Sequence, residues 1–346
     1  MPVKREIPAD RFVLGCHKFG FGPAPGGGAV DVEKHVVPMV RAALELGIRT
    51  FDSAVLYRAT LQLGRAFELL GVDPNSVRFQ TKALRYLGLT GGAAVEHQPE
   101  EMLQGIPARY LGLTDHWDPS PAGVEQQICR ERIEYGGDRL FGVALHDPPD
   151  MQKQIGLAWE RDIRPAVRFL QSAQQAGFLD RIGLGVKEPE FVHRFTAEEP
   201  GALNYAGVTF CPTILAQMLG ILAEAETKNY EVTLMGIYYG QAFVLNEDPA
   251  TAAPFIYNYE IATKEERELM SRYYKICGST PLIHLAASVA GLLAVHFPRL
   301  TQIATTTMTP ARLADTLKLV REAEVPAPVW RELKEAGLIP REFPTS

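Results

Sequence analysis

The chain of 346 residues predicts a (β/α)8 barrel with inserted loops at the carboxyl-terminal face of its strands. Strand-like and helix-like segments alternate eight times over roughly 300 residues, close to the usual size of such a barrel with insertions. Polar, titratable side chains stand near the ends of early apolar segments. Core strands of a parallel sheet favour uninterrupted apolar residues, so this placement indicates a shared polar mouth.

The barrel segments follow one another along the chain, each defined by its apolar period and bounding turn residues. The expected strands are 11–20, 49–55, 77–84, 140–147, 181–187, 205–212, 231–239 and 302–307. The expected helices are 36–47, 59–71, 121–135, 164–177, 191–199, 213–229, 264–277 with 282–297, and 310–320. A doubly wound sheet is the rival fold, but GPAPGGG at 22–28 lacks the dinucleotide-binding glycine spacing. We therefore expect one barrel domain spanning residues 1–346.

Composition argues against several classes of partner. The chain is 46% hydrophobic and 22% charged, with a net charge of −6, which disfavours nucleic acid or an anionic membrane as the main partner. The N-terminal segment lacks a signal-peptide core, and the long apolar run 282–297 carries two histidines, so we interpret it as a buried helix. The four cysteines are scattered without zinc spacing, which fits reduced thiols in the cytoplasm.

Four residues form the strongest functional pattern: Asp52, Tyr57, Lys82 and His146, each expected to close a strand. A lysine ammonium that stabilises phenolate makes a tyrosine a better acid or base, and an aspartate can hold that lysine. A histidine can donate a hydrogen bond to a carbonyl oxygen. No side chain delivers hydride, so a nicotinamide is the natural complement.

Each of the four has an ordinary structural interpretation when taken alone. Asp52 is equally well a helix N-cap, Tyr57 a rim aromatic, Lys82 a solvated charge and His146 a turn cap. The joint pattern favours catalysis, because the carboxyl ends of barrel strands converge on one mouth. Two longer segments, 86–118 and 244–262, are expected to be insertions that shape a substrate or cofactor pocket, or else inert excursions.

Several motifs resemble the aldo-keto reductase superfamily over nearly the whole chain. FDSAVLY, QTKA and VALHDPP are similar to the segments that carry the family's catalytic tetrad. QQAGFLDRIGLGVKEPE and TTTMTPARLADT resemble its later strand and its adenosine-phosphate loop. The tail VPAPVWRELKEAGLIP and the YNY at 257–259 are most similar to the aldose 1-dehydrogenase branch, which includes L-fucose, L-galactose and pyridoxal 4-dehydrogenases. The resemblance implies a barrel that binds an extended NAD(P) without a Rossmann domain.

The resemblance also implies cofactor contacts. Tyr238 matches the aromatic that stacks on the nicotinamide, although the same residue is equally a rim tyrosine. Thr307 and Thr309 stand where a helix N-terminus favours a phosphate. Two further residues match the adenosine-contacting positions, Arg312 and Asp315.

Three positions depart from the family pattern. Lys187 replaces the asparagine near the nicotinamide carboxamide, and Thr306 replaces the cation that often meets an NADP 2′-phosphate. Arg312 can still supply that charge, so NAD(H) and NADP(H) both remain open, with a slight preference for NADP(H). Arg58 stands where a glycine commonly follows the tyrosine.

The substrate side is also predicted. Lys18, Arg58 and Lys187 near one mouth would suit a substrate with a negative group, while the alternative is that they are solvated or contact cofactor phosphates. The expected pocket walls also include His17, Tyr86 and Trp117.

The sequence therefore predicts an NAD(P)-dependent oxidoreductase that interconverts a carbonyl and an alcohol, or a sugar hemiacetal and its lactone, with a small-molecule substrate and no metal. One alternative is a metal-dependent sugar isomerase or epimerase with Asp52, His146 and Asp147 as ligands. The other is a non-catalytic barrel that binds a cofactor.

Overall fold

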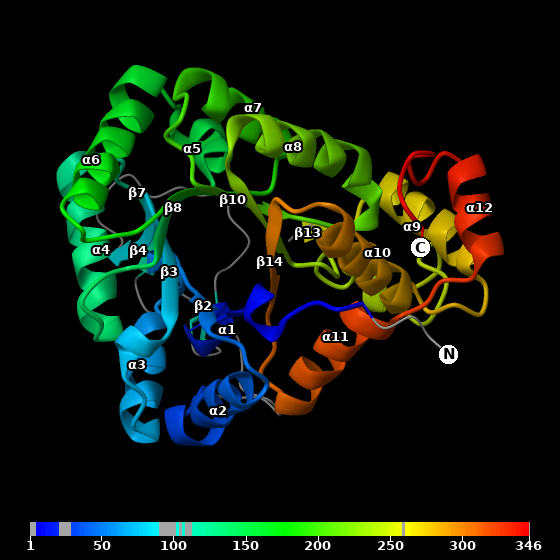
Figure 1. Cartoon of the computed structure of the whole chain (residues 1–346), viewed down its shortest axis with the longest axis horizontal. Helices are drawn as coiled ribbons and strands as arrows, with labels where there is room; N and C mark the ends of the chain where they lie inside the picture. Colours follow the sequence, from blue (N-terminus) through cyan, green and yellow to red (C-terminus); the bar gives the residue numbers. More distant parts are fainter. Residues whose placement is uncertain are drawn as a thin grey trace.

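A closed barrel of eight parallel strands forms the centre of the molecule (Figure 1). The computed structural model describes residues 5–20, 29–89, 102–103, 106–107, 113–257 and 260–345. The barrel strands are β1 (Phe12–Gly15), β2 (Thr50–Asp52), β3 (Arg78–Ala83), β8 (Gly142–His146), β9 (Ile182–Val186), β10 (Tyr205–Thr209), β11 (Glu231–Met235) and β14 (Leu300–Thr305). The predicted (β/α)8 barrel is confirmed.

Strand pairing closes the barrel through β1, which pairs in parallel with both β2 and β14. The register aligns Gly15 with Asp52, Asp52 with Gln80, and Lys82 with Ala144. Side chains two residues apart on a strand share one face, so Gln80 and Lys82 both point into the barrel beside Asp52. This register brings polar side chains from β2, β3 and β8 to the same end of the barrel.

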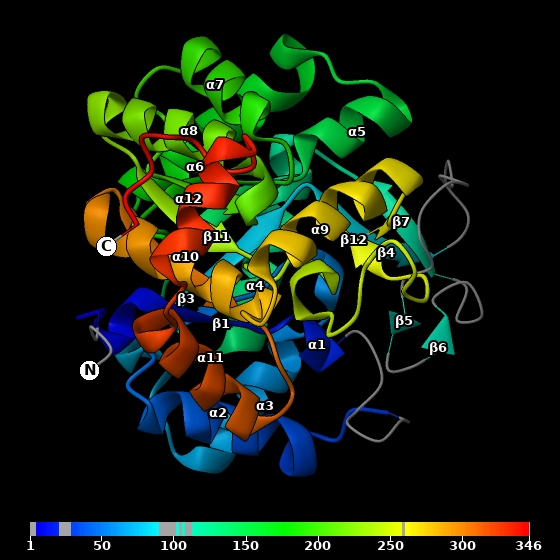
Figure 2. The same ribbon diagram turned by 90° about the vertical axis from the view of Figure 1, so that its right-hand side faces the viewer.

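Helices surround the barrel on its outer side (Figures 1 and 2). One helix or helix pair follows each barrel strand: α2 (Val37–Glu45), α3 (Thr60–Leu70), α4 (Pro121–Tyr135), α6 (Arg164–Gln175) preceded by α5 (Pro148–Ile155), α7 (Pro189–Glu198), α8 (Leu215–Lys228), α10 (Leu282–His296) preceded by α9 (Lys264–Cys277), and α11 (Pro310–Glu322). Two further helices lie outside this repeat, α1 (His17–Gly20) and α12 (Ala327–Glu335). The eight predicted strand-helix units are thus present.

Two corrections concern strand ends. The first expected strand stops at Gly15 and the chain turns into α1, so His17 and Lys18 lie on a short helix. The second strand stops at Asp52, and Tyr57 lies on a 3-10 turn, Val55–Tyr57, rather than closing the strand. Arg58 then adopts the left-handed conformation, with φ 52°, which ends that turn.

The inserted segments contain short antiparallel pairs. β4 (Arg85–Leu89) pairs with β7 (Leu113–Trp117), and β12 (Ile256–Tyr257) pairs with β13 (Glu260–Ile261). A third pair joins β5 (Met102–Leu103) to β6 (Ile106–Pro107). Figure 2 shows β4, β7 and β12 toward the right-hand edge of the molecule. Asn258 and Tyr259 of the YNY motif, the glycine-rich stretch 22–28 and most of 90–112 lie outside the described residues.

The prediction that the apolar run 282–297 forms a buried helix is confirmed. In α10 every residue from Leu285 to Ala294 is buried. Within the described ranges, no single helix has the length and apolarity to cross a membrane. The pair α9 and α10 passes that test together, but it is bent by 89° at the break.

Candidate active site

A buried ion pair lies at the mouth end of β2 and β3. Lys82 Nζ forms an ion pair with Asp52 Oδ1 and donates a hydrogen bond to the Ser53 carbonyl oxygen at 2.8 Å. Gln80 Nε2 donates to the other Asp52 oxygen, Oδ2, at 3.0 Å. Both carboxylate oxygens therefore have a donor, which is the condition for a stable buried charge. Gln80 was not predicted, although its position two residues before Lys82 places it on the same face of β3.

Gly185 on β9 leaves the space that the Lys82 side chain occupies. A Cβ at that position would lie 3.1 Å from Lys82 Cδ, closer than side-chain contacts normally come. The Lys82 side chain thus lies between the Asp52 carboxylate and the backbone of Gly185.

Tyr57 meets Lys82 and His146 above this pair. Lys82 Nζ lies 5.5 Å from the centre of the Tyr57 ring, within cation–π range. The Tyr57 hydroxyl lies 3.5 Å from His146 Nε2, and the two rings pack edge to face with centroids 5.5 Å apart. The structure therefore brings all four predicted tetrad residues together. Tyr57 is positioned by the 3-10 turn after β2, not by the end of a strand.

The imidazole of His146 is uncharged in this setting. Burial, with the nearby cations Lys82, Arg85 and Lys187, holds the pKa of His146 well below its usual value. A neutral imidazole carries one N–H, and the Nε2–H tautomer places that proton toward the space beside the Tyr57 hydroxyl. His146 can then donate a hydrogen bond to a substrate oxygen without adding charge.

Next to His146 is a network of charges that the sequence did not reveal. Arg85 of β4 forms an ion pair with Asp115 of β7, and its Nη1 lies 3.7 Å from Asp147 Oδ2 and 3.9 Å from Asp150 Oδ2. Lys187 donates to Asp150 Oδ2 at 2.6 Å. These residues are far apart in the sequence, so no local spacing predicts their contact. The β4–β7 hairpin is thereby joined to the start of α5.

The three predicted substrate cations have different partners. Lys187 is paired with Asp150, and Arg58 donates from Nη2 to the Leu87 carbonyl oxygen at 2.6 Å. The pKa of Lys18 is lowered by burial and by the positive charge of Arg312, which associates Lys18 with the start of α11 instead. Because the three cations have different neighbours, their use for one anionic substrate group stays a prediction.

Two of the three predicted wall residues lie toward the tetrad. His17 packs on Tyr57 with ring centroids 5.7 Å apart, and burial with the nearby Lys18 and Lys82 lowers the pKa of His17 to about 3. Trp117 covers Arg85, whose guanidinium carbon lies 5.4 Å from the indole centre. Tyr86 points to the opposite face of the hairpin and stacks on His116, so the structure does not bring it to the tetrad.

The predicted cofactor residues follow β14 and begin α11. Thr306 and Thr309 are half-buried, Thr307 is buried, and Arg312 and Asp315 are exposed. Thr309 is the N-cap of α11, but its side chain makes no capping hydrogen bond, and Thr307 Oγ1 accepts from its amide at 3.1 Å. The first turn of α11 thus leaves amide donors for an anion beside the positive charges of Lys18 and Arg312. Tyr238, half-buried, lies three residues beyond β11.

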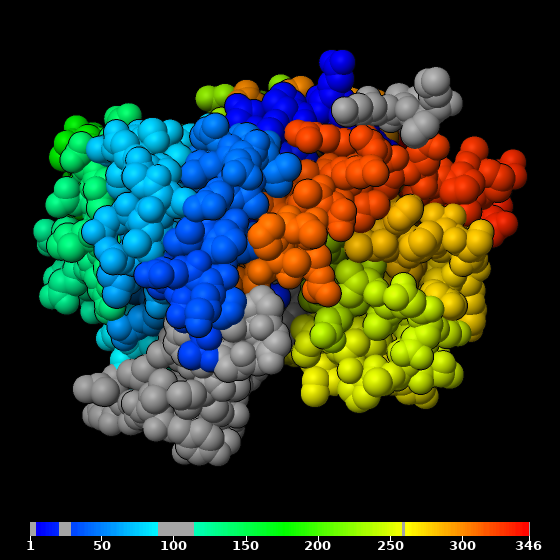
Figure 3. Space-filling model, turned by 90° about the horizontal axis from the view of Figure 1, so that it is seen from below, coloured from blue at the N-terminus to red at the C-terminus, as the bar shows by residue number. Residues whose placement is uncertain are grey.

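A hollow in the molecular surface accompanies these residues. Figure 3 shows it between the orange start of α11 and the yellow-green to yellow segment that follows β11, with part of the blue N-terminal region at its base. Gly15 lies at the end of β1, where a Cβ would approach Thr306 Oγ1 to 2.3 Å, so only a glycine admits that hydroxyl there. The amide donors at the start of α11, the neighbouring cations Lys18 and Arg312, and the hollow beside Gly15 fit the pyrophosphate and ribose of a dinucleotide.

A family model described as the aldo/keto reductase family matches residues 14–218. The chain belongs to that family. A D-threo-aldose 1-dehydrogenase of a Pseudomonas species is 24% identical over 337 residues, which span 92% of this chain and 95% of that protein. This likeness agrees with the predicted resemblance to the aldose 1-dehydrogenase branch.

Solved structures share the fold at low sequence identity. A glycerol dehydrogenase of Gluconobacter oxydans gives a TM-score of 0.66 at 17% identity, covering 100% of this chain and 97% of that one. An aldo-keto reductase of Bacillus halodurans, solved in its holo form, gives 0.64 at 14% identity, covering 99% of each chain. As an aldo/keto reductase, the protein is an NAD(P)(H)-dependent oxidoreductase that interconverts carbonyl and alcohol groups of a small molecule.

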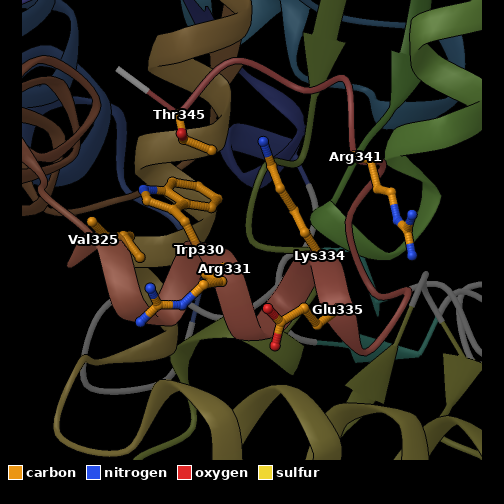
Figure 4. A pocket seen from close by; sticks show the side chains of 8 residues that line it. Val325, Trp330, Arg331, Lys334, Glu335, Arg341 and Thr345 are labelled. Carbon is orange, nitrogen blue, oxygen red and sulfur yellow. The ribbon is translucent and has the colours of Figure 1, made fainter.

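A separate surface pocket of about 480 Å³ lies beside α12 and the C-terminal tail. Its lining includes Trp330 and Lys334, and Arg331 and Arg341 point to opposite sides of it (Figure 4). Lys334 donates to the Phe343 carbonyl oxygen at 2.7 Å, so its charge is already engaged. No predicted site residue lines this pocket, and its cations do not converge on a common ligand.

Proposed function

We propose that this aldo/keto reductase acts on a sugar or sugar-like substrate, and that Tyr57, Lys82, Asp52 and His146 carry its proton chemistry. The observation that carries the proposal is the approach of the Tyr57 hydroxyl to His146 Nε2 beside the Lys82 ammonium. The 24% identity to a D-threo-aldose 1-dehydrogenase over most of both chains supports the substrate class.

Each of the four tetrad residues has its own role in the proposed reaction. Tyr57 gives its proton to the carbonyl oxygen in reduction and takes it from the hydroxyl in oxidation. Lys82 stabilises the phenolate that forms, and Asp52 keeps Lys82 in position. His146 donates from Nε2 to the same substrate oxygen and fixes its orientation. The nicotinamide, when bound, supplies or accepts the hydride.

For the cofactor we propose that Thr307, Thr309 and Arg312 hold the phosphates at the start of α11, with Asp315, Thr306 and Lys187 nearby and Tyr238 against the nicotinamide. Lys18 adds a second cation beside Arg312, which favours NADP(H) over NAD(H). We also propose that residues 1–346 act as one domain in the cytoplasm, where the four free cysteines would stay reduced.

The isomerase alternative is less well supported. It needs Asp52, His146 and Asp147 around one cation, but the oxygens of Asp52 are taken by Lys82 and Gln80. A divalent ion would have to displace both donors.

The test combines nucleotide binding with turnover. Affinities for NADP(H) and NAD(H) are measured for the wild type, Arg312→Ala and Lys318→Ala, the last being an exposed cation farther along α11. We expect tighter NADP(H) binding, weakened roughly tenfold by Arg312→Ala and unchanged in Lys318→Ala. Turnover of neutral aldoses with the preferred nucleotide is then followed by absorbance. Absence of nucleotide binding, or turnover of no hydroxylated carbonyl or polyol, would contradict the proposal.

A further inference from the structure

Asp147 occupies an unusual place beside the tetrad. It directly follows His146 at the start of α5, with φ 43° and ψ 53°, the left-handed region that costs most residues energy. Its Oδ2 lies 3.7 Å from His146 Nε2 and 3.7 Å from Arg85 Nη1. About 13% of its side chain is exposed. The backbone thus turns a carboxylate toward the imidazole that faces Tyr57.

Among the residues that the structure describes, this carboxylate has charge partners but no hydrogen-bond donor. Asp52 receives a donor at each oxygen, Asp115 receives the Arg85 guanidinium, and Asp150 receives Lys187. Within the described part of the chain, the cations that act on Asp147 are Lys187 and Arg85, and Arg85 and His146 lie at ion-pair distance from it. A carboxylate held in this way keeps lone pairs for a ligand that brings O–H groups.

The geometry indicates which part of a substrate arrives there. The reacting oxygen must lie within reach of both the Tyr57 hydroxyl and His146 Nε2, which are 3.5 Å apart. The Asp147 Oδ2 atom lies 3.7 Å from the same His146 Nε2 atom. A hydroxyl on the carbon beside the carbonyl carbon stands one hydrogen-bond length from the carbonyl oxygen. Such a hydroxyl therefore reaches Asp147 while the carbonyl stays on Tyr57 and His146.

We propose that Asp147 is a specificity-determining residue that accepts a hydrogen bond from the hydroxyl group next to the reacting carbon. This inference rests on the proposed tetrad chemistry and names the substrate class, a 2-hydroxy carbonyl compound or the corresponding vicinal diol. Arg85 keeps Asp147 in place from the β4–β7 hairpin, and the Trp117 ring covers Arg85.

The local charge also selects against acids. Asp115, Asp147 and Asp150 are three carboxylates around two cations, Arg85 and Lys187. Adding the neighbouring ion pair of Lys153 with Glu188 leaves the excess of one negative charge unchanged. A neutral hydroxylated substrate therefore fits this side of the mouth better than a substrate with a carboxylate or sulfonate there.

The experiment compares lactaldehyde with propanal, which differ by the hydroxyl next to the carbonyl carbon. Reduction by NAD(P)H is measured with the wild type, Asp147→Asn and Asp115→Asn. We expect the wild type to prefer lactaldehyde in kcat/KM by roughly ten- to hundredfold, the range of a hydrogen bond to a charged group. Asparagine tolerates the left-handed backbone, so Asp147→Asn should fold and lower that preference to below roughly threefold.

Asp115→Asn is the matched control because Asp115 bonds Arg85 at Nε and Nη2, away from the Nη1 that faces Asp147. It should retain the preference for lactaldehyde even if its stability falls. An unchanged preference in Asp147→Asn, an equal loss in Asp115→Asn, or an altered nucleotide affinity in place of an altered preference would overturn the proposal. Failure of the wild type to reduce propanal or lactaldehyde at all would instead count against the proposed function.

Discussion

The two carboxylates nearest the proposed proton chemistry, Asp52 and Asp147, differ in how their oxygens are used. Asp52, on the β2 side, accepts from Lys82 and Gln80 and is buried with its lysine. Asp147, on the α5 side, is also buried, but it lies only at ion-pair distance from Arg85 and accepts no hydrogen bond from the described residues. A fully bonded carboxylate can fix a neighbour, whereas one with charge partners alone can receive a ligand. We therefore expect Asp52 and its donors to govern the catalytic rate, and Asp147 to govern the choice of substrate.

Among the residues that support Tyr57, the largest effect is expected from Lys82→Met. Loss of the ammonium beside Tyr57 should lower kcat by roughly 10²–10³-fold, because the phenolate loses its stabilising charge. The variant also leaves Asp52 buried without its partner, which costs about 3–5 kcal/mol of folding stability. The double variant Asp52→Asn/Lys82→Met removes that lone charge and should refold while staying as slow. Recovery of rate in the double variant would show that the loss came from misfolding.

A pH series sharpens the role of Asp147. Burial, opposed by Lys187 and Arg85, raises the pKa of Asp147 to about 6. The charged groups that act on it are Lys187 after β9, Asp150 of α5, Arg85 of β4 and Glu188 before α7, with neutral His146 beside it. Behind them, Asp115 of β7 pairs with Arg85, and Lys153 of α5 pairs with Asp150. Below about pH 6 the carboxyl holds a proton and accepts poorly. The preference for lactaldehyde over propanal should therefore decline as pH falls through that value.

The same series in Asp147→Asn provides the comparison. Its small preference should stay flat over the same pH range, since the amide does not titrate. A parallel decline in wild type and variant would assign the titration to another group.

Gln80→Leu tests the support beneath Asp52. Loss of the donor to Asp52 Oδ2 should lower kcat by several-fold to about tenfold, with little change in KM, because Lys82 is held less firmly. Gln302→Leu is the matched control, since this buried glutamine bonds Thr233 across β11 and β14. Both variants should lose stability, but only Gln80→Leu should lose rate. Equal kcat values in Gln80→Leu and Gln302→Leu would show that Gln80 does not position Lys82.

The smallest effect concerns Glu131 of α4, a buried acid behind β3 that accepts from Thr60 and Thr81. Burial raises its pKa from 4.5 to about 7. Between these values the folded protein keeps a proton that the unfolded chain has released, so stability falls as pH rises. The change is on the order of 3 kcal/mol across that window.

Denaturant unfolding at several pH values measures this effect. Glu131→Gln should gain stability relative to the wild type between pH 4.5 and about 7, and the difference should level off above that range. Glu134→Gln, one turn along the same helix and bonded to Arg130, is the control. A stability difference for Glu131→Gln that does not change with pH would contradict the assignment.

The sequence predicted the barrel and the meeting of the tetrad because both depend on repeated local patterns. The parallel register then brings strand ends together without any further information. Tyr57 was misplaced by a few residues, since the apolar run after Asp52 has the same composition in a strand or a 3-10 turn. The direction of Lys18 and Arg58 depends on turn geometry that composition does not encode.

Arg85, Asp115 and Asp150 were missed for a different reason, and Asp147 was considered only as a metal ligand. Arg85 contacts three residues from two separate segments, Asp115 of β7 and Asp147 and Asp150 at the start of α5, and these pairings exist only after the hairpin folds onto the barrel. Asp147 and Asp150 follow His146 closely in the sequence, but a DPPD sequence is also typical of a helix start. Left-handed backbone at Asp147 was the decisive signal, and it is visible only in the structure.

The central claim is that Tyr57 transfers the proton while the bound nucleotide transfers hydride. The most direct test is a single-turnover measurement of NAD(P)H oxidation with lactaldehyde, comparing the wild type with Tyr57→Phe at saturating nucleotide. The account predicts unchanged nucleotide affinity and a hydride-transfer rate lowered by roughly 10²–10⁴-fold in the variant. A single-turnover rate equal to that of the wild type would contradict it.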